Sequence, residues 1–146
     1  MDSKQHVVCP HCQTTNRVPV GQRDITVNCG RCHEPLFDGH PVAVTEAQWD
    51  AHLNRHDIPV VVDFWAPWCG PCRSMAPAFE QTARALEPQA RFLKVNTDAS
   101  QALAARYNIR SIPTLMVFKG GREVQRQAGA LPAGALQQWV ARAIAD

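Results

Sequence analysis

The sequence predicts an α/β domain with a mixed central sheet flanked by helices, preceded by a small cysteine-rich segment. Strand-like and helix-like segments alternate from residue 41 to residue 146, which is typical of parallel strand pairs with helices on both faces. The first 40 residues hold four cysteines, little continuous apolar sequence and no helical periodicity. Prolines and a glycine within residues 34–41 suit a connector. We therefore expect two domains, at 1–40 and 41–146.

The elements of the larger domain follow from hydrophobic patterning and from capping and turn residues. Residues 60–62 open a short β-branched apolar run, which is typical of a strand buried on both faces. Thr45 and Gln48 fit a helix capping box, and the turn at 119–122 predicts an antiparallel hairpin. The expected order is a strand at 42–44, a helix at 45–55, a strand at 59–66, a helix at 69–87, a strand at 91–96, a helix at 101–107, strands at 114–118 and 123–127, and a final helix that includes residues 136–144.

Charge and hydropathy argue against several kinds of partner. The chain has 15 lysines and arginines against 13 aspartates and glutamates, so it lacks the concentrated basic excess of a nucleic-acid-binding surface. It has no apolar run of roughly 18 residues, the length that a membrane span requires. Its first residues, MDSKQHVV, do not resemble a signal peptide. We expect a cytoplasmic protein with no nucleic-acid partner and no membrane partner.

All six cysteines occur in C-x-x-C pairs. A reducing cytosol disfavours structural disulfides, so such pairs more often bind metal or carry out redox chemistry. The third pair, Cys69 and Cys72, follows a predicted buried strand and opens a helix. The first helical turn offers unpaired N–H groups and a partial positive charge, which favour the nucleophilic thiolate at Cys69. Cys72 is then placed to attack a mixed disulfide formed at Cys69 and to release the reduced substrate.

Gly70 and Pro71, between these two cysteines, suit the same chemistry. Gly70 permits the close approach of a substrate chain, and Pro71 fits the first helical turn because its missing N–H would be unpaired there anyway. The alternative for this cysteine pair is half of another metal site, but redox chemistry is the use typical of a strand, a C-x-x-C pair and a helix in succession.

Residues 62–72, VDFWAPWCGPC, resemble the active-site segment of the thioredoxin family, and the resemblance covers residues 41–146. It implies the thioredoxin fold and the reduction of disulfides in protein substrates, with an NADPH-dependent thioredoxin reductase as electron donor and no bound organic cofactor. It also implies that Ile112 and Pro113 form a cis-proline loop opposite the active site and that Gly129 lines the substrate groove. With an exposed Trp68 beside the cysteines, the candidate substrate-binding residues are Trp68, Gly70, Pro71, Ile112, Pro113 and Gly129.

Asp63 joins Cys69 and Cys72 as a candidate catalytic residue. It lies in an apolar strand, where an ionised carboxylate is costly. Burial would raise its pKa and let it accept a proton from Cys72, directly or through water. The family resemblance supports this role. The alternatives are an edge position facing water and a carboxylate satisfied by nearby Lys94.

The other two cysteine pairs predict a zinc site. A gap of 16 residues separates Cys9 and Cys12 from Cys29 and Cys32, and two C-x-x-C turns at such spacing supply four tetrahedral ligands. We expect one structural zinc per chain in a zinc-ribbon-like domain, with the metal providing folding energy. Rubredoxin-like iron and two further redox dithiols are the alternatives. A zinc-bearing head before a thioredoxin domain resembles the thioredoxin-2 group of bacterial thioredoxins.

Two other functions stay open at this level. A dithiol oxidase or isomerase would use the same cysteines, although the Gly-Pro dipeptide between them resembles that of the reducing members of the family. A non-catalytic binding module would use the zinc head as a docking element or the apolar groove as a holdase surface. The intact Cys69 and Cys72 pair argues against a purely non-catalytic role.

Overall fold

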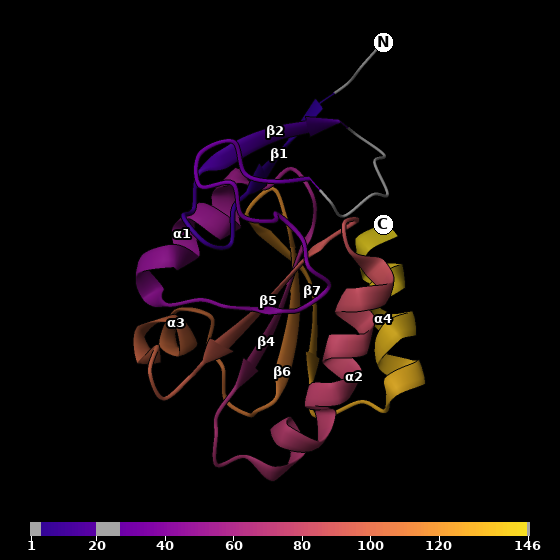
Figure 1. Cartoon of the computed structure of the whole chain (residues 1–146). Helices are drawn as coiled ribbons and strands as arrows, with labels where there is room; N and C mark the ends of the chain where they lie inside the picture. Colours follow the sequence, from indigo (N-terminus) through magenta and orange to yellow (C-terminus); the bar gives the residue numbers. More distant parts are fainter. Residues whose placement is uncertain (1–3, 20–26, 146) are drawn as a thin grey trace.

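A five-stranded mixed sheet forms the centre of the larger domain (Figure 1). The computed structural model describes residues 4–19 and 27–145. The elements of this domain are β3 (Val42–Ala43), α1 (Glu46–Arg55), β4 (Val60–Trp65), α2 (Gly70–Leu86), β5 (Arg91–Asn96), α3 (Gln101–Arg106), β6 (Thr114–Lys119), β7 (Arg122–Ala128) and α4 (Ala133–Ala145). The strand order is β3-β5-β4-β6-β7. β5 pairs in parallel with β3 and β4, whereas β6 is antiparallel to β4 and β7.

Helices cover both faces of this sheet (Figure 1). Trp49 of α1 and Leu103 of α3 belong to the apolar cluster on one face. Phe79 of α2 and Leu136 of α4 belong to the cluster on the other face. The central strand, β4, is buried at every position from 60 to 64. The mixed sheet flanked by helices is therefore confirmed, and burial on both faces explains the apolar run of β4.

The predicted order of elements in the larger domain is confirmed. Where the sequence predicts both ends of a helix or strand, each end lies within one residue of the observed end. α1 begins after Thr45, whose backbone N–H donates to Gln48 Oε1 over 3.1 Å, as a capping box requires. The β6–β7 hairpin turns at Gly120 and Gly121, where φ is +59° and +80°. Among the described residues, every helix is too short or too polar to cross a lipid bilayer.

The N-terminal segment contains a second sheet that the sequence analysis did not predict. β1 (Lys4–Val8) and β2 (Thr15–Pro19) pair in antiparallel fashion, with Val8 opposite Thr15. The first cysteine turn, at residues 9–14, connects them. Both strands are short and partly polar, so their hydrophobic pattern is weak. Figure 1 shows this sheet at the end of the molecule opposite the start of α2.

Candidate active site and candidate metal centre

The third cysteine pair lies at the start of α2, just beyond the end of β4. Cys69 is the N-cap of this helix, and its Sγ accepts a hydrogen bond from the Cys72 backbone N–H over 3.2 Å. The two sulfurs are joined in a disulfide, and both side chains are buried, whereas Gly70 and Pro71 between them are exposed. The hydrogen bond and the helix dipole favour negative charge on the Cys69 sulfur. In the reduced protein this arrangement suits Cys69 as the nucleophile.

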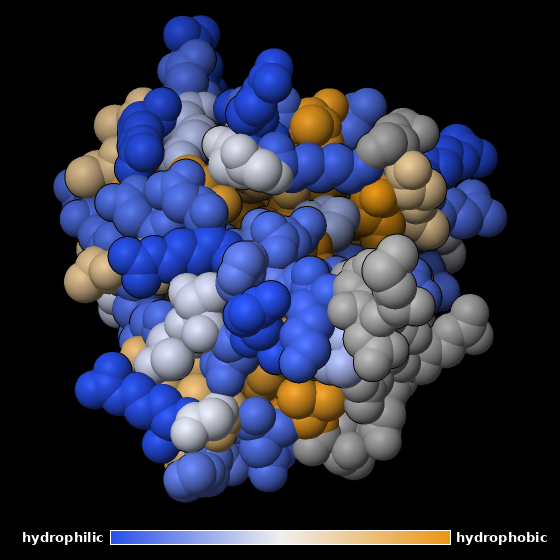
Figure 2. All heavy atoms as spheres, turned by 90° about the horizontal axis from the view of Figure 1, so that it is seen from above, coloured by the Kyte–Doolittle hydropathy of each residue, from blue (hydrophilic) through white to orange (hydrophobic). Residues whose placement is uncertain are grey.

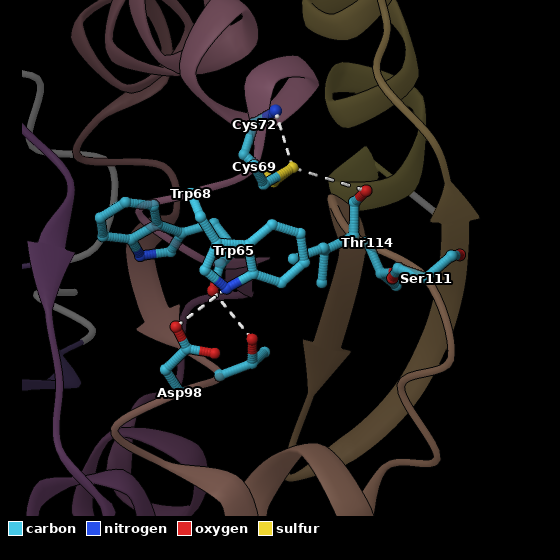
Figure 3. The surroundings of a disulfide bond; sticks show 9 residues. Trp65, Trp68, Cys69, Cys72, Asp98, Ser111 and Thr114 are labelled. Atoms are coloured by element: carbon cyan, nitrogen blue, oxygen red, sulfur yellow. Dashed lines mark hydrogen bonds between the residues drawn. A yellow bond between two sulfur atoms is a disulfide. The ribbon is translucent and has the colours of Figure 1, made fainter.

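The loop that precedes β6 lies against this disulfide. The Ile112 carbonyl oxygen is 3.8 Å from Cys69 Sγ, and the Ile112–Pro113 peptide bond is cis. The Gly129 backbone N–H donates to the Pro113 carbonyl over 2.8 Å, and the φ of Gly129 is +92°, a conformation that favours glycine. The structure therefore brings Ile112, Pro113 and Gly129 together beside Cys69, and Figure 3 shows the loop between Ser111 and Thr114 next to the sulfurs.

Trp68 forms an exposed apolar surface next to the disulfide. Its side chain is 70% exposed, and its indole N–H donates to Asp98 Oδ2 over 3.0 Å (Figure 3). A groove of about 190 Å³ lies beside it, lined in part by Arg110 and Ile112. The bond to Asp98 holds the indole ring in place at the edge of this groove.

Asp63 lies inside the sheet, in the strand that leads toward the cysteines. Its side chain is 1% exposed, and it is in register with Lys94 on β5 and Leu115 on β6. Within the described parts of the chain, neither carboxylate oxygen has a hydrogen-bond partner. Burial raises the pKa of Asp63 to about 7, although the Lys94 charge opposes this shift. An edge position facing water is thereby excluded, and Lys94 lies close by without a hydrogen bond to the carboxylate.

The four cysteines of the N-terminal segment converge on one point. Their Sγ atoms all lie within 4.8 Å of one another. The Cys9 and Cys32 sulfurs are 3.6 Å apart, and the Cys12 and Cys29 sulfurs are 3.7 Å apart. A tetrahedral zinc with Zn–S bonds of about 2.3 Å requires sulfurs about 3.8 Å apart. Four thiolates at this spacing fit a tetrahedral metal ion of the zinc type.

The two cysteine turns have the same backbone structure. In each turn, the Sγ of the first cysteine accepts a hydrogen bond from the backbone N–H two residues later. The carbonyl of the same cysteine accepts one from the backbone N–H four residues later, and that fourth residue has a positive φ. The donors to Sγ are His11 and Arg31, at 3.3 Å each, and the donors to the carbonyl are Gln13 and His33, at 3.0 Å each. N–H groups that point at sulfur stabilise thiolate charge. The side chains of His11 and His33 are exposed and lie outside the four-sulfur cluster.

The sequence analysis missed the residues that join the N-terminal segment to the larger domain. Arg91, at the start of β5, is buried, and its Nη2 donates to the carbonyls of Val8 and Leu36. His56, just after α1, accepts a hydrogen bond from the Val8 N–H. A charged residue that opens an apolar strand was the available signal for Arg91. Asp98, which holds Trp68, had no comparable signal in the sequence.

The fold and the site together define the class of thiol–disulfide oxidoreductases. Three features combine: a mixed sheet with helices on both faces, a disulfide at the N-terminus of a helix, and a cis-proline loop against that disulfide. A cysteine pair in this setting exchanges between dithiol and disulfide without a bound cofactor to supply the reacting group.

Comparison with known proteins identifies the family. The family model described as Thioredoxin matches residues 40–142. Thioredoxin C-3 of Corynebacterium nephridii is 42% identical to this chain over 134 residues, which cover 92% of each chain. Thioredoxin 1 of Nostoc sp. is 48% identical over 95 residues, which cover 65% of this chain and 89% of the relative. A mutant thioredoxin from Halobacterium salinarum has a structure that matches with a TM-score of 0.66 and 31% identity over 74% of this chain and 94% of that one. The chain belongs to the thioredoxin family and is a thioredoxin-type thiol–disulfide oxidoreductase.

Replacing Asp63 by Asn is expected to stabilise the protein, and the gain is expected to grow with pH. The pKa of Asp63 is about 7 in the folded protein, compared with an ordinary value of 3.8. Ionisation therefore favours the unfolded state, and the free energy of unfolding of the wild type falls as the pH rises from 4 toward 7. A shift of about three pKa units corresponds to about 4 kcal/mol as an upper bound. In urea denaturation, we expect Asp63→Asn to exceed the wild type by about 2–4 kcal/mol at pH 8 and by much less at pH 4.5.

Asp50→Asn is the matched control, because the Asp50 side chain is 70% exposed. Its difference from the wild type should be the same at both pH values. A gain for Asp63→Asn that did not change between pH 4.5 and pH 8 would contradict a buried carboxyl with a raised pKa.

Proposed function

We propose that this protein reduces disulfides in protein substrates and carries a structural zinc site, as a member of the thioredoxin-2 group. The proposed organisation is a zinc-binding domain at residues 1–40 and a thioredoxin domain at residues 41–146. The position of the Cys69–Cys72 pair carries the proposal. It lies at the N-terminus of α2 and against the Ile112 carbonyl, where a chain bound along the loop would present its disulfide to Cys69.

Reduction proceeds in two exchange steps. The Cys69 thiolate attacks one sulfur of the substrate disulfide, forms a new S–S bond and expels the other substrate sulfur as a thiolate. Cys72 then loses its proton and attacks the Cys69 sulfur, so that the substrate leaves as a second thiolate and the Cys69–Cys72 disulfide forms. Two electrons pass from the dithiol to the substrate. An NADPH-dependent thioredoxin reductase returns them through the same cysteines, so the chain needs no nicotinamide site of its own.

Asp63 acts as the base for the second step. A carboxyl group with a pKa of about 7 exchanges protons readily at neutral pH. Both of its oxygens are buried and without a hydrogen-bond partner among the described residues, so the carboxylate has acceptor capacity to spare. We propose that it takes the Cys72 proton through water as Cys72 attacks the mixed disulfide.

The substrate-binding surface offers backbone and apolar groups, which suits many different protein substrates. Trp68 supplies exposed apolar area, and the backbone next to Gly70 is open, with no neighbouring atom within 4 Å of an added Cβ. Ile112 and Gly129 border the same surface through the cis-proline loop. Recognition through such groups depends little on the sequence of the substrate.

Zinc held by the four N-terminal cysteines is the second part of the proposal. Its support is the spacing of the sulfurs and the N–H groups directed at them. All four positions would be protein ligands, so the metal would supply folding free energy rather than catalysis. Four thiolates of this kind persist most readily in a reducing compartment, and we place the protein in the cytoplasm on that basis.

Cys69→Ser is expected to abolish the reduction of insulin by NADPH and thioredoxin reductase, because it removes the attacking sulfur. Cys72→Ser is expected to stop turnover but to accumulate a mixed disulfide between Cys69 and the substrate, detectable by mass spectrometry without reductant. The double variant should form no adduct. An adduct formed by Cys69→Ser and not by Cys72→Ser would reverse the two roles.

Asp63→Asn is expected to slow release of the mixed disulfide by about tenfold or more at neutral pH, because the variant lacks the proton acceptor for Cys72. Single-turnover rapid-quench experiments between pH 6 and pH 8 would separate this step from the initial attack. Asp50→Asn should release the substrate at the wild-type rate. Release kinetics for Asp63→Asn that matched the wild type across this range would refute the proposed role.

The purified, desalted protein is expected to contain one zinc per chain by elemental analysis. Under native conditions the reduced protein should then show two rapidly titrating thiols, those of Cys69 and Cys72. One iron per chain would replace zinc in the proposal by a rubredoxin-like centre. A metal-free protein with six titratable thiols would remove the metal site and assign further redox pairs to the N-terminal segment.

A further inference from the structure

A buried arginine joins the N-terminal segment to the larger domain, at the end of α2 remote from the dithiol. Arg91 is 1% exposed, and its Nη2 donates to the Val8 carbonyl over 3.0 Å and to the Leu36 carbonyl over 2.7 Å. The guanidinium group lies 4.4 Å from the centre of the Phe37 ring. The Glu87 carboxyl group lies 3.7 Å from Nη1. Three of these four contacts are made to the N-terminal segment.

The two carbonyls that Arg91 binds lie on either side of the cysteine turns in the sequence. Val8 directly precedes Cys9, the first of the four cysteines, and Leu36 follows Cys32, the last of them, by four residues. Arg91 Nη2 therefore connects the residue before the first cysteine turn to a residue just after the second. Its two hydrogen bonds restrict the distance between the two turns, and hence between the two sulfur pairs.

His56 binds the other backbone group of Val8. Its Nδ1 lies 3.2 Å from the Val8 nitrogen and accepts that N–H, and its Nε2 lies 3.0 Å from His52 Nδ1. Because Nδ1 accepts, a neutral His56 carries its proton on Nε2 and donates it to His52. Both histidines are buried. Two side chains of the larger domain therefore bind the backbone of Val8: Arg91 at the carbonyl and His56 at the N–H.

We propose that Arg91 and His56 are positioning residues for the metal site, holding Val8 and Leu36 so that the four sulfurs meet at tetrahedral spacing. This inference rests on the proposed zinc site. The segment's own apolar cluster is small, and one of its members, Ile58, comes from the larger domain. Ordering a short segment costs conformational entropy, and a surface that holds it in place lowers that cost for metal binding.

The coupling acts in both directions. Since the docked segment favours zinc binding, zinc binding must favour the docked segment by the same factor. Release of the segment would break both hydrogen bonds of the Arg91 guanidinium and its contact with Phe37, which is unfavourable. The stability of the thioredoxin domain therefore depends on the metal, although the dithiol lies at the far end of α2 (Figure 1).

The test compares zinc release from the full-length, zinc-loaded protein to an excess of chromogenic chelator. Arg91→Met removes both hydrogen bonds. Glu87→Gln combined with Arg91→Met also removes the carboxylate charge that would otherwise lose its cationic partner, and the Gln oxygen can still accept the Gly39 N–H. His56→Phe keeps a ring but loses the acceptor for Val8. We expect each to release zinc about tenfold faster or more, the size of effect seen when groups that orient metal ligands are removed. Arg91→Lys should fall between Arg91→Met and the wild type, because an ammonium group lacks the planar fork.

Arg142→Met, on the exposed face of α4, is the matched control and should release zinc at the wild-type rate. Thermal unfolding gives a second readout. Chelation should lower the melting temperature of the wild type, and this difference should shrink in the Arg91 and His56 variants. Near-UV circular dichroism confirms that each variant is folded, and Arg91→Lys serves for the comparison where Arg91→Met is not folded.

Release at the wild-type rate from folded Arg91 and His56 variants, with zinc still bound to the wild type, would overturn the inference and leave the zinc site intact. A wild-type protein without zinc would overturn the zinc site and the inference with it. Faster release from Arg142→Met as well would assign the effect to general destabilisation and would also overturn the inference.

Discussion

Burial of β4 between β5 and β6 is the constraint on which both sites depend. Backbone pairing on both edges and helices on both faces fix this strand within the domain. The chain approaches β4 through Ile58, which packs in the apolar cluster of the cysteine segment, and leaves it at Ala66, which packs with Cys69 and Cys72. The same burial raises the pKa of Asp63 in the middle of the strand. One strand therefore positions the cysteine segment, the acid and the Cys69–Cys72 pair.

The helix α2 separates the two cysteine sites. Its 17 residues extend about 25 Å at 1.5 Å per residue, from the N-cap at Cys69 to the C-cap at Glu87, which pairs with Arg91. Where Figure 2 colours this end of the molecule by hydropathy, the surface is mainly hydrophilic, with hydrophobic residues visible as separate patches. The apolar side chains of the segment instead face the larger domain at Ile58. The N-terminal segment is therefore packed against the larger domain, whereas Trp68 presents its apolar ring to solvent.

Sequence reasoning worked where structure and chemistry are local. The apolar run before the third cysteine pair identified a buried strand because a fully buried strand needs apolar side chains on both faces. Thr45 and Gln48 marked the start of α1 because the capping box closes within one helical turn. The sequence analysis did not predict β1 and β2, because these strands have no clear hydrophobic period. They form by pairing with each other across the first cysteine turn. The contact between Trp68 and Asp98 joins two loops and had no pattern to reveal it.

The sequence by itself determined which cysteines lie close together in pairs, because each C-x-x-C pair places two sulfurs within a single turn whatever surrounds it. It also determined that Asp63 stands in an apolar strand. Only the tertiary structure decided how deeply that carboxyl is buried, which loop faces Cys69, and what Arg91 and His56 bind. Those contacts join residues 43, 48, 55 and 83 positions apart, and no local spacing rule reaches across such distances. They arise because the cysteine segment packs against the start of β5 and the end of α1, and because antiparallel pairing of β4 with β6 brings the loop before β6 beside the end of β4.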